Sequence, residues 1–354
     1  MKMYFRLKPE VYLELGDEKS VVYNLIDTNF IHLDKENTEK LLMAENNLEI
    51  QKSKLFDNLE KIGWGDYHDK KVFHDKLRKY NIFNLNKFWK EAPNVTLATL
   101  QITNACENNC NLCNEIFCPL CVKSEDKTNC LTLEQCKNII NKISFYGVKS
   151  IILTGGDLRK VTFINELIEF ITFKNINIET CIVGGESINI KDSLIRLNIF
   201  ISNKHELDKT IKNYRMFKNV RIFASNKSLL SGVKDLNPNW MIQKVDSDKN
   251  SFSTKNLIPV NLDRYFDKRM SDICLNNKIT IDANGNVIPC MGNYKKKLYN
   301  VFENKMHDII KGIEKDYWNI NILNKEEYPK CSSCEFKYAC NKCRFSNQEE
   351  NCLV

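Results

Sequence analysis

Between residues 94 and 245, segments typical of buried strands alternate with segments typical of amphipathic helices, and this alternation restricts the fold more than any other feature of the chain. Short runs of Val, Ile, Leu and Phe indicate strands, and longer segments with an apolar residue every three or four positions indicate helices. The predicted strands are 95–103, 149–157, 176–185, 198–202, 219–225 and 239–245, and the predicted helices are 131–147, 163–175 and 205–217. Strand–helix–strand repetition builds parallel sheets. We therefore predict an α/β domain over residues 93–254, with a sheet that is open or closed into a partial (β/α)6-type barrel.

The first of these helices has the clearest boundary signals. Thr132 followed by Gln135 matches a capping box, in which each side chain satisfies a backbone N–H at the start of a helix. Ile139 and Ile143 fall on one face, and Gly147 is a typical stop signal. The sequence therefore predicts where this helix begins, which face it buries and where it ends.

Two further regions flank the α/β domain. Residues 1–92 contain no cysteine and read as short strands and helices, which predicts a small α+β, winged-helix-like module. Residues 255–354 show no clear periodicity and are rich in cysteine, which predicts an irregular domain. Within the first region, the predicted strands lie in 4–15 and 19–33, and the predicted helices are 34–47, 52–63 and 73–82.

The start of the chain and its hydropathy indicate a cytoplasmic protein. The opening MKMYFRLKPE lacks the apolar core of a secretory signal. No run approaches the roughly 18 apolar residues of a membrane helix, so we expect no membrane partner. A net charge of +7 is compatible with nucleic-acid binding, but the lysines are spread along the chain, and thiolates bound to metal would offset part of the charge. We therefore expect a solvated surface and no nucleic-acid partner.

Fifteen cysteines lie largely in two groups, between residues 106 and 136 and between residues 274 and 352. In a reducing compartment such clusters favour metal binding or catalysis over disulfides. None of the five histidines lies beside a closely spaced pair or triplet of cysteines. Zinc sites often combine Cys with His, whereas iron–sulfur clusters take thiolates almost exclusively, so the composition favours iron–sulfur.

The first group begins with a C-x3-C-x2-C motif formed by Cys106, Cys110 and Cys113. Three thiolates leave one iron of a four-iron cluster open to an outside ligand. The motif follows the first predicted strand, and TGGD follows the second. Because the carboxyl ends of parallel strands meet at one edge of a sheet, the two motifs are expected to lie together.

These motifs resemble those of the radical S-adenosylmethionine superfamily. The resemblance implies that the three cysteines hold a [4Fe–4S] cluster whose open iron binds S-adenosylmethionine, and that reductive cleavage of this cofactor yields a 5′-deoxyadenosyl radical that abstracts a substrate hydrogen. It implies cofactor-binding roles for the glycine motif and for a serine at a later strand end, which here are Gly155, Gly156, Asp157 and Ser202. Two positions depart from the family pattern without removing a ligand. Leu112 replaces the usual aromatic residue, and Asp157 replaces the usual Glu.

The second group resembles the SPASM extension, which binds two auxiliary [4Fe–4S] clusters. The resemblance implies one complete cluster and one that lacks a protein ligand. The complete set would be Cys331, Cys334, Cys340 and Cys352, and the incomplete set Cys274, Cys290 and Cys343. The final C-x2-C spacing departs from the usual x3, and a pair of zinc ribbons is the alternative interpretation.

Five cysteines remain outside these sets. Cys136 and Cys181 lie in apolar patterns and are expected to be buried packing residues. Cys118 and Cys121 follow the first motif, and three roles stay open for them: a ligand of the incomplete cluster, substrate handling, or none. No role is assigned to Cys130.

The combined resemblance implies a peptide maturase that forms a thioether or carbon–carbon crosslink in a ribosomally made precursor, preferably one containing cysteine, and that takes electrons from a flavodoxin- or ferredoxin-type reductase. Two alternatives are an enzyme of the sulfatase-maturing type, which oxidises a protein Cys or Ser, and a non-catalytic zinc-binding adaptor. Residues 1–92 would either capture the precursor's leader as an added strand or form a structural cap. The sequence does not indicate a catalytic acid or base.

Overall fold

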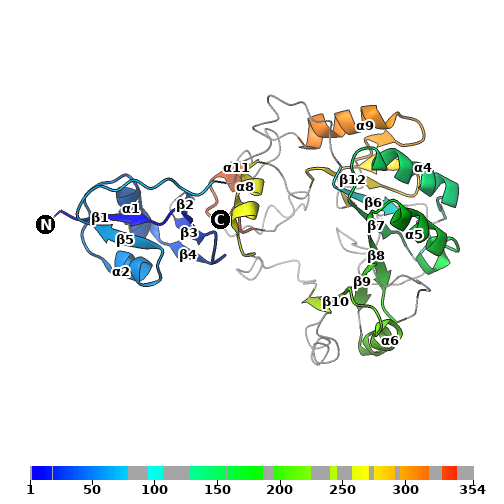
Figure 1. Ribbon diagram of the computed structural model, residues 1–354, viewed down its shortest axis with the longest axis horizontal. Coiled ribbons are helices and arrows are strands. Elements are labelled where there is room, and N and C mark those ends of the chain that lie inside the picture. The colour runs from blue at the N-terminus through cyan, green and yellow to red at the C-terminus, as the bar shows by residue number, and fades with distance from the viewer. Residues whose placement is uncertain are drawn as a thin grey trace. The chain divides into compact units, whose positions relative to one another are not determined.

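A computed structural model of the chain describes residues 2–17, 19–78, 95–106, 128–156, 158–185, 188, 195–201, 203–224, 240–244, 257–270, 275–291, 296–318 and 329–340. These residues form two compact units (Figure 1). The sheet unit comprises residues 91–251 and 274–318. The terminal unit comprises residues 1–90, 252–273 and 319–354.

A nine-stranded sheet forms the centre of the sheet unit, in the order β11-β10-β9-β8-β7-β6-β12-β13-β14. The strands from β11 to β12 are joined by parallel pairings, and β13 and β14 are added antiparallel. All six strands predicted between residues 94 and 245 are present and lie side by side in chain order. The strands are β6 (Leu97–Gln101), β7 (Ser150–Thr154), β8 (Asn177–Val183), β9 (Arg196–Ile201), β10 (Val220–Ala224), β11 (Met241–Lys244), β12 (Lys278–Ile281), β13 (Asn286–Ile288) and β14 (Tyr299–Asn300). The mostly parallel α/β fold is therefore confirmed, while closure toward a partial barrel stays a prediction.

Three helices, α4 (Leu133–Ser144), α5 (Ile164–Phe173) and α6 (Lys204–Tyr214), lie on one side of this sheet (Figure 1). The predicted capping box is present, because the Thr132 side chain accepts from Gln135 N and the Gln135 side chain accepts from Thr132 N. Gly147 has φ +77°, a conformation that favours glycine and ends the helical segment.

Residues 275–291 and 296–318 are more regular than the sequence predicted. Strand β12 pairs in parallel with β6, with Ile279 opposite Ala98. Helix α9 (Met306–Ile313) and a π-helical turn (Glu314–Trp318) follow. The indole Nε1–H of Trp318 donates to Lys278 O at 3.1 Å and so fastens the end of this segment to β12. The prediction of an irregular region is therefore wrong for these residues, because a four-residue strand is too short to show periodicity.

Within the terminal unit, the described residues between 2 and 78 form two small antiparallel sheets and two helices. One sheet pairs β1 with β5, and the other has the order β2-β3-β4. The small α+β composition is as expected, while the winged-helix-like arrangement stays unconfirmed. The elements are β1 (Tyr4–Leu7), β2 (Val11–Leu15), β3 (Ser20–Asn24), β4 (Phe30–Leu33), α1 (Lys35–Glu45), α2 (Lys54–Lys61) and β5 (Gly65–His68).

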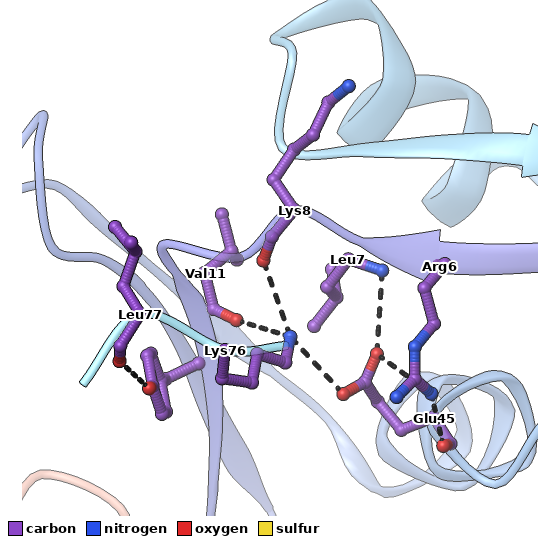
Figure 2. A network of polar contacts seen from close by, with 8 residues as sticks. Arg6, Leu7, Lys8, Val11, Glu45, Lys76 and Leu77 are labelled. Atoms are coloured by element: carbon purple, nitrogen blue, oxygen red, sulfur yellow. Dashed lines mark hydrogen bonds and ion pairs between the residues drawn. The ribbon is translucent and has the colours of Figure 1, made fainter. Parts of the chain in front are cut away.

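Residues 73–78 are not helical, so the predicted helix 73–82 is wrong over this part, and residues 79–82 lie outside the described chain. Lys76 explains the difference (Figure 2). Its Nζ donates to Val11 O at 2.8 Å and to Lys8 O at 3.3 Å, and it pairs with the carboxylate of Glu45 at 3.4 Å. Because Lys76 is held by the bend between β1 and β2, this segment lies against that bend and does not form a helix.

Two later segments complete the terminal unit. They contain α8 (Leu262–Met270) and α11 (Pro329–Ser332), which lie beside the β2-β3-β4 sheet (Figure 1). No helix in the described parts of the chain is long and apolar enough to cross a membrane.

Candidate iron–sulfur sites

The first candidate site lies where β6 and β7 end. Ile102, the residue after β6, donates its N–H to the carbonyl oxygen of Thr154, the last residue of β7, at 2.8 Å. This bond extends the pairing of the two strands by one residue. Thr103 then forms a bridge with Cys130. These contacts fix the chain as it enters the loop that begins with Ala105 and Cys106.

Gly155 and Gly156, which follow β7, pack directly against the backbone from Thr103 to Cys106. Gly155 has φ +130°, and a Cβ on it would lie 2.5 Å from Thr103 O. A Cβ on Gly156 would lie 2.0 Å from Ala105 O and 3.0 Å from the Cβ of Cys106. Side chains at either position are therefore excluded by backbone atoms. The expectation that the glycine motif and the cysteine loop meet is fulfilled at Gly155, Gly156 and Cys106.

Asn104 is a site residue that the sequence reasoning missed. It is 6% exposed, and its Oδ1 accepts a hydrogen bond from Gln101 Nε2. That bond fixes the orientation of the amide, and within the described chain its Nδ2 has no hydrogen-bond partner. A buried N–H without a partner is costly, so this group is available to an acceptor such as a cluster sulfur or a cofactor oxygen. The sequence signal was the concentration of polar residues in QITN, directly after the apolar part of the strand.

The pairing register of the sheet separates an apolar face from a polar face. Successive residues of a strand point to opposite faces, and the register aligns Leu100, Leu153 and their neighbours on one face and Gln101 with Thr154 on the other. The same register brings Cys181 opposite Asn198 on the polar face. The buried faces of α4 and α5 are mainly isoleucine and leucine, so we expect the apolar face of the sheet to pack against these helices and the polar face to be available to ligands.

Two groups of contacts order this polar face near β8, β9 and β10. The Glu179 carboxylate accepts from Arg196 Nη1 at 2.7 Å and from Asn198 Nδ2 at 3.3 Å. The rings of Phe200 and Phe223 stack with centroids 4.7 Å apart. The face therefore presents fixed charge, amide and aromatic groups beside one another.

The remaining predicted residues of this site lie outside the described residues: Cys110, Cys113, Asp157 and Ser202, together with Cys118 and Cys121. Cys136 and Cys181 are buried, as expected for packing residues, and burial raises the pKa of the Cys136 thiol to about 12. Cys130 is exposed.

The second candidate site involves the C-terminal cysteines. Cys331, Cys334 and Cys340 are partly buried and belong to the terminal unit, whereas Cys290 follows β13 in the sheet unit. Burial raises the pKa of the Cys334 thiol to about 11, and Glu335, Cys340 and Cys331 add to this effect. Cys274, Cys343 and Cys352 lie outside the described residues.

The donor set fits iron–sulfur clusters in its chemistry, since it consists of thiols, and at the first site the Asn104 amide supplies a buried N–H donor for a bound group. Within the described ranges, no group of three or more His, Cys, Asp or Glu side chains is gathered as a metal site.

A family model describing the SPASM iron–sulfur cluster-binding domain matches residues 274–335. The predicted SPASM-type extension is thereby confirmed. Cys274, Cys290, Cys331 and Cys334 fall inside the matched range, and Cys340, Cys343 and Cys352 follow it. The matched range includes residues of both compact units.

Solved structures similar to the chain include Streptococcus suis SuiB bound to precursor peptide SuiA, with 13% identity, 96% of each chain covered and a TM-score of 0.47. Native anSMEcpe with bound AdoMet and Cp18Cys peptide shows 14% identity over 73% of this chain and 92% of that one, with a TM-score of 0.45. BtrN in complex with AdoMet and 2-DOIA shows 11% identity over 69% of this chain and 87% of that one, with a TM-score of 0.35. No curated protein matches the chain.

Proposed function

We propose that the chain is a radical S-adenosylmethionine enzyme that matures a ribosomally made peptide by forming a thioether or carbon–carbon crosslink. The observation that carries this proposal is the contact of the Gly155–Gly156 turn with the backbone from Thr103 to Cys106, in a chain that also contains a SPASM domain. The contact places a glycine turn and the first thiol of a C-x3-C-x2-C motif at the same edge of a parallel sheet.

In this proposal Cys106, Cys110 and Cys113 hold a [4Fe–4S] cluster, which when bound supplies the electron that cleaves S-adenosylmethionine and so generates the hydrogen-abstracting radical. Because neither Gly155 nor Gly156 has a side chain, their backbone packs directly against the segment from Thr103 to Cys106, and we propose that it contacts the cofactor beside the cluster. Asp157 and Ser202 are proposed to contact the cofactor. Asn104 offers its buried Nδ2–H groups to the bound assembly.

The C-terminal cysteines would hold two auxiliary [4Fe–4S] clusters. We assign Cys331, Cys334, Cys340 and Cys352 to one cluster. Cys274, Cys290 and Cys343 would hold the other, which has one position left for a further thiol. A cysteine of the precursor is the proposed ligand there, because coordination to a metal deprotonates a thiol and holds it in place.

The polar face of the sheet is the proposed surface for the reacting part of the peptide. Its stacked phenylalanines and its Glu179–Arg196 pair offer apolar and charged contacts to a peptide. The N-terminal sheets offer strand edges to which a leader could add. A flavodoxin- or ferredoxin-type reductase in the cytoplasm is the proposed electron donor.

The test replaces Cys106, Cys110 and Cys113 together by Ala. We expect the variant to lose about four iron atoms per chain and all formation of 5′-deoxyadenosine from S-adenosylmethionine and dithionite under anaerobic conditions, while the auxiliary clusters stay bound. The matched control is Cys130→Ala, because Cys130 is an exposed thiol that pairs through its backbone with Thr103. Cofactor cleavage at the wild-type rate in the triple variant would contradict the proposal.

Metal analysis separates this proposal from its rivals. If the protein contains zinc in place of iron and sulfide, the alternative of a non-catalytic zinc-binding adaptor is supported. With iron present, mass spectrometry of a precursor peptide after turnover, with and without a carbonyl-reactive hydrazide, decides between the two enzymes. A crosslink and the oxidation of Ser to an aldehyde each remove two hydrogens from the peptide, but only an aldehyde formed from Ser or Cys is labelled by the hydrazide.

A further inference from the structure

The terminal unit is assembled from three segments that are far apart in the sequence. Its core joins residues of β3 with residues before and within α8 and with the segment between Cys334 and Cys340. The buried members are Val21, Tyr23, Leu25, Val260, Tyr265, Phe336, Tyr338 and Ala339. Cys334 itself packs against this cluster. Strand β3 of the β2-β3-β4 sheet therefore shares one hydrophobic core with the chain segment that contains Cys334.

Glu335, the residue directly after Cys334, is fastened to this sheet by both its side chain and its backbone. Its side chain is 9% exposed and accepts a hydrogen bond from His32 Nε2 at 2.9 Å. Its carbonyl accepts from the hydroxyl of Tyr23 at 3.1 Å. Strands β3 and β4 thus fix the position of the residue next to a proposed ligand.

Gly16, in the turn between β2 and β3, fits closely against the same loop. A Cβ added to Gly16 would lie 2.7 Å from the Glu335 carboxylate, 3.1 Å from Ser333 O and 3.2 Å from Glu335 N. Ser333 lies between Cys331 and Cys334, so the turn contacts the backbone that sets the spacing of these two thiols.

The other end of the cysteine segment is held by α8. Lys268 Nζ donates to Tyr338 O at 2.8 Å and to Cys340 O at 2.9 Å. Leu257, shortly before α8, forms a bridge with Cys340. Glu14 of β2 contributes as well, because its carboxylate accepts from Tyr265 of α8 and lies 3.7 Å from Lys337 Nζ. The segment Cys331–Cys340 is therefore braced from both ends.

We propose that the β2-β3-β4 sheet is a structural part of the auxiliary cluster site, with Gly16 and His32 as positioning residues for Cys331, Cys334 and Cys340. The inference rests on the cluster ligation given under the proposed function, and it adds a role for the N-terminal region beyond leader capture. The cysteine segment has little regular structure of its own, α11 being four residues long. Outside groups must therefore fix its backbone if the thiols are to bind iron in a defined geometry.

The experiment uses the full-length chain, reconstituted anaerobically with iron and sulfide, in four variants. Gly16→Ala inserts a methyl group against the Cys331–Cys334 loop, and Lys19→Ala is the control, an exposed side chain in the same turn. His32→Ala leaves the Glu335 carboxylate without its donor, whereas His32→Gln retains a side-chain N–H that can replace it. Iron and sulfide per chain and the spectrum of the dithionite-reduced clusters are measured for each variant.

We expect Gly16→Ala and His32→Ala each to lose up to one cluster, about four iron atoms per chain, with 5′-deoxyadenosine formation in the absence of peptide retained. His32→Gln and Lys19→Ala should keep the full complement. If His32→Ala keeps the wild-type iron content and spectrum, the inference is wrong even if Gly16→Ala fails to fold. Equal losses in His32→Ala and His32→Gln would also overturn it. A wild-type chain that binds no auxiliary cluster would instead refute the proposed function.

Discussion

Gly156→Ala is the sharpest test of the first site, because the structure gives the size of the clash. The new Cβ would lie 2.0 Å from Ala105 O, whereas ordinary contacts begin at 3.4 Å, so the two backbones would have to separate by 3.4 − 2.0 = 1.4 Å. Ala105 cannot swing aside as a side chain would, since its N–H donates to Thr103 Oγ1 at 3.0 Å. Overpacking of this kind costs about 1–3 kcal/mol.

The separation would move Cys106 away from the glycine turn. We therefore expect S-adenosylmethionine binding and iron content to fall by more than the loss of stability alone would cause. Equilibrium dialysis of S-adenosylmethionine should show binding weakened at least tenfold, and the iron content should fall by up to one cluster. The free energy of unfolding, measured by urea denaturation, should fall by about 1–3 kcal/mol.

Gly312→Ala is the matched control for this change. A Cβ on Gly312 of α9 would lie 1.9 Å from the hydroxyl oxygen of Tyr299 of β14. This contact is as close as the one at Gly156, but it involves the far end of a side chain and not a backbone atom. We expect this variant to lose some stability and to keep its iron and its cofactor affinity. Wild-type cofactor binding in Gly156→Ala, or equal losses in both variants, would refute the reasoning.

Two further predictions concern the helix cap and the open cysteines. Thr132→Ala removes the hydroxyl that accepts a hydrogen bond from Gln135 N, and should lower the free energy of unfolding by about 1 kcal/mol without changing iron content. Thermal and urea unfolding measure this change. An unchanged free energy of unfolding would mean that water replaces the cap. Cys118→Ser and Cys121→Ser should each leave the iron content unchanged if the incomplete auxiliary cluster is open to substrate. If either variant loses about one cluster of iron, the protein itself closes that position.

The sequence determined the elements whose signals are local. Strands β6 to β11 and helices α4, α5 and α6 were predicted because an alternation of short apolar runs and amphipathic segments is repeated along the chain. The capping box at Thr132 needs only neighbouring residues, and it formed as predicted. The SPASM-type extension was recognisable because the spacing of cysteines is itself a local pattern.

Tertiary structure decided whatever depends on partners distant in the sequence. Strand β12 is a short segment with polar residues on either side. It is a strand because it pairs with β6, starting at Leu97. Residues 73–78 have a helical composition, but Lys76 forms its bonds with the β1–β2 bend and with Glu45 instead. The contact of Gly156 with Ala105 and the joining of His32 to Glu335 arise only when segments about 50 and 300 residues apart come together. Periodicity reports which face of an element is buried, but only packing fixes what covers it.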